Sequence, residues 1–163
     1  METTYDAEAY RTKLAADMAA HDVKLATFAK RQAEILPGNK AALFAALAAA
    51  GIQTVVIEFD GSGDEGQIES ITAFTIDNAE TDLPEARIEI REAVFDQPAL
   101  SVSLQSPHEI IEGMAYDFLG QTHEVWPNND GAYGEFTFTV ADQTITLDFN
   151  ERFTDPTNYQ HEF

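Results

Sequence analysis

The chain has 163 residues, 44% of them hydrophobic, with no cysteine and a formal net charge of -20. This composition excludes disulfides and cysteine-ligated metals, and the charge repels nucleic acid, so direct nucleic-acid binding is not expected. No apolar run approaches the roughly 18–20 residues of a membrane span, and the first residues lack the basic and then apolar pattern of a secretion signal. We therefore expect one cytoplasmic domain over residues 1–163, with a hydrophobic core and no membrane segment.

The first 51 residues predict two helices. Apolar residues recur at three-and-four spacing over residues 4–35, which is typical of one long amphipathic helix. Pro37 and Gly38 are expected to end this helix, and Asn39 to cap a second one over residues 40–50. The stripe of the long helix predicts packing against a sheet, or a homodimer through this helix. Its members are Tyr10, Leu14, Met18, His21, Leu25, Phe28 and Ile35.

Residues 52–163 predict an antiparallel sheet of two hairpins, with one or two further strands and a third helix packed on it. The first hairpin joins strands over residues 52–59 and 67–76 through a wide glycine-rich loop. Short strands are indicated over residues 86–90 and 100–104. Ser106, Pro107 and Glu109 mark a helix start, with a cap, a first-turn proline and a capping-box glutamate. The predicted fold class is therefore α+β.

The clearest hairpin lies over residues 135–149, where apolar and polar residues alternate strictly. A two-residue turn at Asp142 and Gln143 would place all the apolar side chains on one face. Because Asp-Gln lacks the glycine that such turns prefer, a wider loop over residues 141–144 stays open. The two-residue turn predicts that Val140 faces Ile145, Phe138 faces Leu147 and Phe136 faces Phe149.

Charge is unevenly distributed along the chain. Residues 1–50 contain six acids and six bases, so the remaining 23 of 29 acids and three of nine bases lie in residues 51–163. An acidic field of this kind attracts cations and basic protein surfaces. The alternative is that the acids serve solubility or a salt-rich habitat.

Two loops rich in Asp and Gly are candidate ligand sites. In the first, Asp60, Ser62 and Asp64 match positions one, three and five of an EF-hand calcium loop. The match then fails, because Glu65 stands where the loop needs glycine and Ile71 where it needs glutamate. The predicted flanking elements are also strands rather than helices. Two interpretations of this loop stay open, a calcium site of another kind and a plain hairpin loop.

The second loop covers residues 127–134, ahead of the second hairpin, and its Asn, Asp and Gly residues favour tight turns. If both loops end strands at one edge of the same sheet, their carboxylates repel one another unless a cation or an arginine intervenes. Calcium is therefore one prediction, and pairing with Arg152 is the other. Loops at opposite ends of the sheet would only turn the chain. The calcium prediction uses Asp60, Asp64 and Asp130.

Other polar residues give weaker signals for chemistry. His108 and Glu112 are four apart on a predicted helix, a spacing more typical of an exposed hydrogen bond than of a metal pair. Trp126, the single tryptophan, is expected to anchor a loop rather than to stack on a ligand. A hydrolase-type site would combine His123, Asp130 and Arg152. The full set of candidate binding residues is Asp60, Ser62, Asp64, His123, Trp126, Asn128, Asn129, Asp130, Tyr133 and Arg152.

Short segments at residues 60–64, 116–119, 121–123, 126, 128–135 and 147–153 share a common pattern. In this pattern the chain resembles a family of uncharacterised bacterial proteins that are often found on plasmids and mobile elements. The resemblance covers residues 52–76 and 107–163, and it departs from the family pattern at Pro127, where an acid is expected. The family implies no activity and no cofactor.

Taken with the charge, these signals favour a non-enzymatic binding protein. The acidic part of the chain would face a basic protein surface, and mimicry of DNA charge is one form of this hypothesis. The alternatives are the calcium module through the Asp/Gly loops and the hydrolase-type enzyme around His123.

Overall fold

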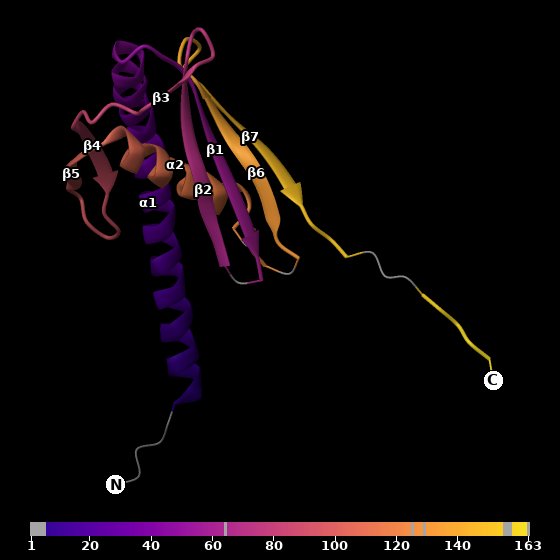
Figure 1. The fold of residues 1–163 in the computed structure, drawn as a ribbon. Helices are drawn as coiled ribbons and strands as arrows, with labels where there is room; N and C mark the ends of the chain where they lie inside the picture. The colour runs from indigo at the N-terminus through magenta and orange to yellow at the C-terminus, as the bar shows by residue number, and fades with distance from the viewer. Residues whose placement is uncertain (1–5, 64, 125, 129, 155–157, 163) are drawn as a thin grey trace. The chain divides into compact units, whose positions relative to one another are not determined.

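The computed structural model describes residues 6–63, 65–124, 126–128, 130–154 and 158–162. Contacts divide the chain into two compact units, Met1–Lys40 with Glu89–Leu104 and Ala41–Ile88 with Gln105–Phe163. Two helices and antiparallel sheets confirm the α+β class (Figure 1). The elements are α1 (Ala7–Ala49), β1 (Ile52–Ser62), β2 (Glu65–Thr75), β3 (Glu80–Thr81), β4 (Ile88–Ala93), β5 (Leu100–Gln105), α2 (Pro107–Thr122), β6 (Ala132–Thr139) and β7 (Thr144–Glu151).

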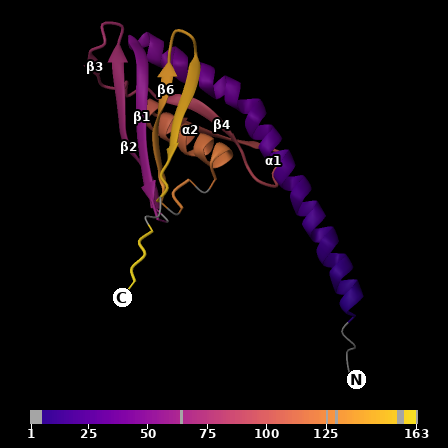
Figure 2. The same ribbon diagram turned by 90° about the vertical axis from the view of Figure 1, so that its right-hand side faces the viewer.

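The second unit is built on a five-stranded antiparallel sheet in the order β3-β2-β1-β6-β7. The two predicted hairpins are therefore joined through pairing of β1 with β6, and β1 is the central strand. Helix α2 lies against one face of this sheet (Figure 2), where Phe118 approaches Phe136 with ring centroids 6.2 Å apart. The end of α1 packs on the same face through Phe44 and Phe138. We call this the core face and the opposite one the outer face.

Strand β2 contains a bulge that explains why its buried face is hard to read from the sequence. Ala73 and Ile71 pair with core-face residues of β1. On the N-terminal side of Ser70 the register shifts by one residue, so that Ile68 pairs with Phe59. The extra residue reverses the alternation, so Ile71 and Ile68 share the core face although they are three apart. The backbone N–H of Ile68 donates to the hydroxyl of Tyr116 on α2, 3.0 Å away.

Both hairpin turns differ from the prediction. A wide loop over residues 60–66 is wrong, because β1 runs through Ser62 and β2 begins at Glu65. Gly63 has a φ of 65°, the left-handed conformation that tight hairpin turns require. In the second hairpin, residues 140–143 form a four-residue turn with Gln143 at a φ of 53°. The wider-loop alternative is thus the correct one, displaced by one residue.

The wider turn shifts the β6–β7 register by two residues. Phe138 pairs with Ile145, Phe136 with Leu147 and Gly134 with Phe149, so the predicted pairs are wrong. Because side chains alternate with a period of two, a shift of two leaves every residue on its predicted face.

A single helix, α1, replaces the two predicted N-terminal helices, and Pro37 lies inside it. Proline removes one backbone hydrogen bond from a helix and normally ends or kinks it. Here the carbonyl that loses its donor belongs to Ala33, which is an exposed residue. Asn39 does not cap a helix. Its side chain bonds to both backbone groups of Arg91 in β4, at 2.8 and 3.1 Å.

The helix ends that the structure describes follow simple capping chemistry. Asp6 accepts the backbone N–H groups of Glu8 and Ala9 and starts α1. The predicted start of α2 is confirmed, with a complete capping box between Ser106 and Glu109. The backbone N–H of Ser106 holds the pKa of the Glu109 carboxyl below its ordinary value.

The first unit consists of most of α1 and the two-stranded sheet β4–β5. The loop between these strands packs on the helix, with the ring of Phe95 edge-on to both His21 and Phe28. Lys24 pairs with Asp96 at 3.0 Å, and the predicted packing role of His21 agrees with this contact. Neither described helix is both long and apolar enough to cross a membrane.

Candidate functional site

The two Asp/Gly loops meet at one end of the sheet. The register places Asp60 of β1 beside Tyr133 of β6, and Tyr133 beside Asn150 of β7. Arg152, which follows β7, binds both oxygens of the Asp60 carboxylate, at 3.0 and 2.7 Å, and also the carbonyl of Gly61 at 3.2 Å. Its guanidinium lies 4.7 Å from the centre of the Tyr133 ring. A planar arginine fork matches a carboxylate in this two-bond arrangement, which fixes the end of β7 against β1.

Asp130 has separate partners in the same region. Its Oδ2 accepts the backbone N–H and the hydroxyl of Thr154, at 2.6 and 2.9 Å. The carbonyl of Gly131 accepts the backbone N–H of Arg152 at 2.9 Å. Each described aspartate of the two loops is thus bound by the segment after β7, which supports arginine pairing over a shared cation.

The calcium prediction also depends on Asp64, which, like Asn129, lies outside the described residues. Among the residues that the structure does describe, no three His, Cys, Asp or Glu side chains are placed to hold a metal ion. Ser62 and Asn128 are exposed. Calcium binding stays a prediction that no contact favours.

Trp126 covers a pair of glycines on the core face. Gly61 and Gly66 are direct partners in the β1–β2 hairpin. A Cβ atom added to Gly61 would lie 2.5 Å from the indole, and one added to Gly66 would lie 2.3 Å from it. The ring is also edge-on to Phe59, with centroids 5.4 Å apart. Trp126 therefore closes the end of the core, in agreement with its predicted role as an anchor.

His123 forms the C-terminal cap of α2 and its backbone N–H bonds to the carbonyl of Leu119. Its imidazole stacks face to face on Phe149, with centroids 3.6 Å apart and planes 3° from parallel. Phe149 in turn stacks on Phe59. The imidazole thus extends the aromatic end of the core, while the other members of the proposed hydrolase site, Asp130 and Arg152, are bound to Thr154 and Asp60.

A family model described as a family of unknown function (DUF6878) matches residues 35–163. The chain belongs to this family. No curated protein and no solved structure matches it in the corresponding searches. The match takes in the cluster around Arg152, the Trp126 anchor and also residues 77–106, which the resemblance found in the sequence leaves out.

The DUF6878 region also carries a row of carboxylates on the outer face that the sequence does not reveal. Glu58 of β1 pairs with Glu135 of β6, and Glu135 pairs with Asp148 of β7. All three side chains are exposed, and none of them makes an ion pair within the described residues. Ser70 donates to Glu58 at 2.7 Å, and Asn150 approaches Asp148 at 3.4 Å. We call Glu58, Glu135 and Asp148 the acidic row.

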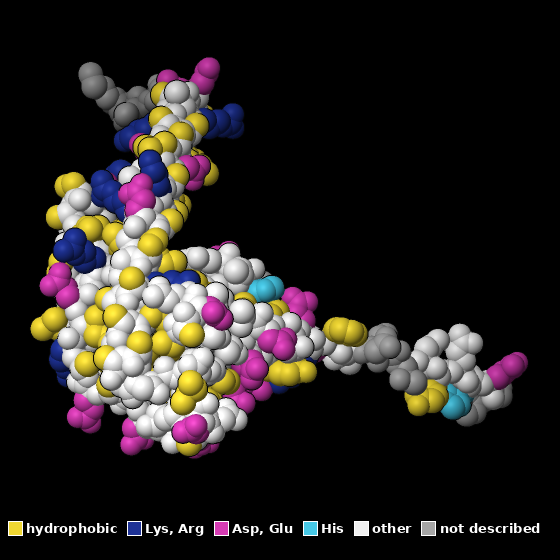
Figure 3. Space-filling model, turned by 90° about the horizontal axis from the view of Figure 1, so that it is seen from above, with side chains coloured by type: hydrophobic (Ala, Val, Ile, Leu, Met, Phe, Trp, Pro, Cys, Tyr) yellow, Lys and Arg dark blue, Asp and Glu magenta, His cyan; other side chains and the backbone are white. Residues whose placement is uncertain are grey.

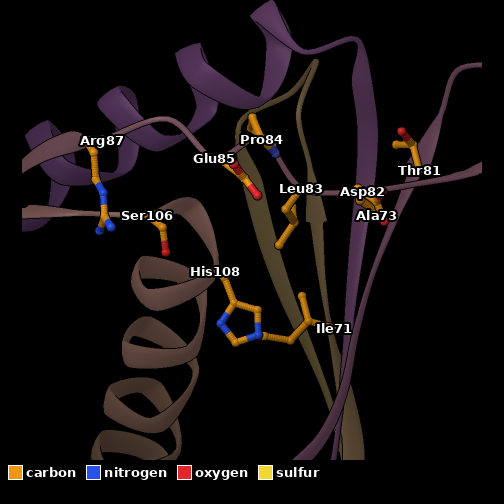
Figure 4. A pocket seen from close by; sticks show the side chains of 10 residues that line it. All are labelled: Ile71, Ala73, Thr81, Asp82, Leu83, Pro84, Glu85, Arg87, Ser106 and His108. Carbon is orange, nitrogen blue, oxygen red and sulfur yellow. The ribbon is translucent and has the colours of Figure 1, made fainter.

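A cavity of about 650 Å³ lies between β2, residues 81–87 and the start of α2 (Figure 4). Its arginine and histidine already have carboxylate partners, since Arg87 lies 3.6 Å from Glu109 and His108 lies 3.6 Å from Glu112. The latter pair is exposed, as its spacing predicts. The lining residues are Ile71, Ala73, Thr81, Asp82, Leu83, Pro84, Glu85, Arg87, Ser106 and His108.

The Arg152 contact gives a pH-dependent prediction. Hydrogen bonds from Arg152 hold the pKa of the Asp60 carboxyl below its ordinary value, and the same bonds raise the pKa of Arg152. A depressed folded-state pKa contributes stability above the unfolded-state pKa, and that stability is lost as the pH falls through the folded-state pKa. We expect Arg152→Gln to raise the pKa of Asp60, measured by NMR titration of its carboxyl carbon.

Arg87→Gln is the matched control, because Arg87 faces Glu109 rather than Asp60. It should leave the Asp60 titration unchanged. An Asp60 pKa that is the same in the wild type and in Arg152→Gln would contradict the assigned cause. Because the pair is partly exposed to solvent, its effect on overall stability should be small.

Proposed function

We propose that this member of DUF6878 is a binding protein whose outer sheet face docks a basic surface of another protein. The observation that carries the proposal is the acidic row. Neighbouring strands lie about 4.8 Å apart, so three carboxylates paired across three strands stand close together. Like charges directly opposite one another destabilise a sheet. Lysine or arginine side chains of a partner would relieve that repulsion.

The surroundings of the acidic row suit a docking surface. Next along the strands lies a row of hydroxyls, in which Thr72, Thr137 and Thr146 flank Val56. On the other side of the row stands Tyr133, whose side chain is 44% exposed. Tyrosine is enriched in protein interfaces because it combines a large apolar ring with a hydrogen-bonding group. The outer face therefore combines negative charge, hydroxyl groups and an aromatic anchor.

The charge of the whole region supports the same reading. In residues 51–163, 23 acids stand against three bases, and one of these bases, Arg152, is paired with Asp60. A field of one sign speeds the encounter with an oppositely charged protein and repels nucleic acid. The finer form of the proposal is that the face occupies the site of a nucleic-acid-binding protein by mimicking DNA charge. Competition between this chain and double-stranded DNA for a captured partner would separate the two forms.

The test is to neutralise the acidic row. We expect the triple variant Glu58→Gln, Glu135→Gln and Asp148→Asn to lose affinity for partners that the wild type retains from its host, by at least tenfold. Binding of the wild type should also weaken steeply as salt rises, because exposed charges are screened over about 8–10 Å at 0.1–0.15 M salt. Binding is measured by titration of the captured partner at two salt concentrations.

The control variant removes three exposed acids outside the strands of the sheet but in the same unit, through Asp77→Asn, Glu124→Gln and Asp142→Asn. Its net charge equals that of the triple variant. If both variants bind equally well, position on the outer face is irrelevant and the proposal is wrong. An affinity that is the same at low and high salt would equally contradict it.

A further inference from the structure

The first unit exposes more large apolar side chains than it buries. Of its described residues, the buried hydrophobic ones are Ile90 and Ala93. Leu14, Met18 and Leu25 on the helix are 45%, 61% and 46% exposed. Hydrophobic side chains are visible along this part of α1 in Figure 3. Exposed apolar groups that form one continuous patch mark an interaction surface.

These helical residues form a continuous stripe. The β4–β5 loop covers the stripe at His21 and Phe28 through Phe95. Met18 and Leu14 continue the stripe towards the N-terminus, about one and two turns before His21. The spacing from Leu14 through Met18, His21, Leu25 and Phe28 alternates between four and three residues. This alternation is the seam along which two helices pack side by side.

The first unit is nearly neutral, whereas the second unit is strongly acidic. It contains nine acids and seven bases, whereas the second unit contains the other 20 acids and only Arg87 and Arg152. Two copies of a chain with a net charge of -20 repel one another through their second units. The nearly neutral first unit is where two copies can approach.

The flank of the stripe is self-complementary. Arg11 and Asp22 are eleven residues apart, which is about three helical turns, so both lie on the same flank. Both side chains are exposed. If two copies of the helix run antiparallel about a point midway between them, Arg11 of each copy faces Asp22 of the other. Leu14 and Met18 lie on either side of that same midpoint and would face each other across the interface.

We infer that a second copy of this chain covers the stripe, in an antiparallel helix pair centred between Leu14 and Met18. The interface is two-fold symmetric, with apolar contacts along the seam and two Arg11–Asp22 pairs beside it. The inference is independent of the proposed function, because it uses residues outside the outer sheet face. It deepens the sequence prediction of a homodimer by assigning orientation and register.

The first test is the mass of the full chain in solution, by light scattering after size-exclusion chromatography. We expect twice the 18.0 kDa of one chain, at low and at high salt, because the seam is apolar. Met18→Glu should weaken the dimer by at least tenfold. Ala16→Glu, on the opposite side of the helix, should not. Circular dichroism checks that both variants keep their helix.

The second test is a charge swap that reads out orientation. Arg11→Asp and Asp22→Arg should each weaken the dimer several-fold, since each change brings like charges together at both ends. The double variant should restore the wild-type affinity. A protein that is monomeric up to about 100 µM would overturn the inference. So would a dimer that survives Met18→Glu but is lost with Val102→Lys, because Val102 lies on β5, where Leu100, Val102 and Leu104 are the exposed apolar residues.

Discussion

Phe138→Ala is expected to lower the free energy of unfolding by about 3–5 kcal/mol, the range typical of a large aromatic removed from a packed core. Phe138 is 0% exposed, on the strand next to the central one. Its ring centroid lies 6.1 Å from that of Phe44 at the end of α1. The variant would leave a cavity between helix and sheet that neither element can close without moving the other.

A denaturant titration followed by circular dichroism measures this loss. Thr146→Ala is the control, because Thr146 is exposed on the outer face of β7 and should change stability by less than about 0.5 kcal/mol. A loss below about 1 kcal/mol for Phe138→Ala would mean that the aromatic residues of β6 do not face the core. The result does not depend on the β6–β7 register, since a shift of two keeps Phe138 on the same face.

The faces of β6 and β7 follow from the sequence because alternation is a local property of each strand. Their register does not, because it depends on the length of the turn. Asp142 and Gln143 look like a two-residue turn, but only Gln143 adopts a positive φ, and the turn takes in four residues. The predicted helix break at Pro37, which the structure does not have, is a similar case. Proline disfavours a helix interior locally, yet contacts between Asn39 and Arg91 hold the helix in place on the β4 side.

Some contacts of the candidate site can be predicted from the sequence, and others cannot. The meeting of Asp60 and Arg152 can be predicted, because both lie near the ends of strands of one sheet and Arg152 is one of only three bases in the acidic residues 51–163. The packing of Trp126 on Gly61 and Gly66 cannot be predicted, because it depends on the pairing of two glycines across a hairpin. The acidic row is hidden for a stronger reason. It requires β1 to pair with β6, two strands that are about 70 residues apart in the sequence, with β2 to β5 and α2 between them.

Gly66→Ala is expected to displace Trp126 and to lower the free energy of unfolding by about 1–3 kcal/mol, the usual range for overpacking. The added Cβ would lie 2.3, 2.5 and 2.8 Å from three atoms of the indole, far inside van der Waals contact. The indole would have to shift away from the added methyl group, and its edge-on contact with Phe59 would then be disturbed. Since Trp126 is the only tryptophan, its fluorescence reports this movement directly.

The matched control is Gly113→Ala on α2, where an added Cβ meets nothing within 4 Å. Alanine is a better helix former than glycine, so this variant should gain about 0.5–1 kcal/mol and leave the fluorescence unchanged. The two glycine variants are therefore expected to have opposite signs in a thermal or denaturant titration. Gly66→Ala should also shift the tryptophan emission to longer wavelength, as the ring becomes more exposed. A Gly66→Ala protein with wild-type emission and stability would show that Trp126 does not rest on the glycine pair, and that the loop before β6 closes the core in another way.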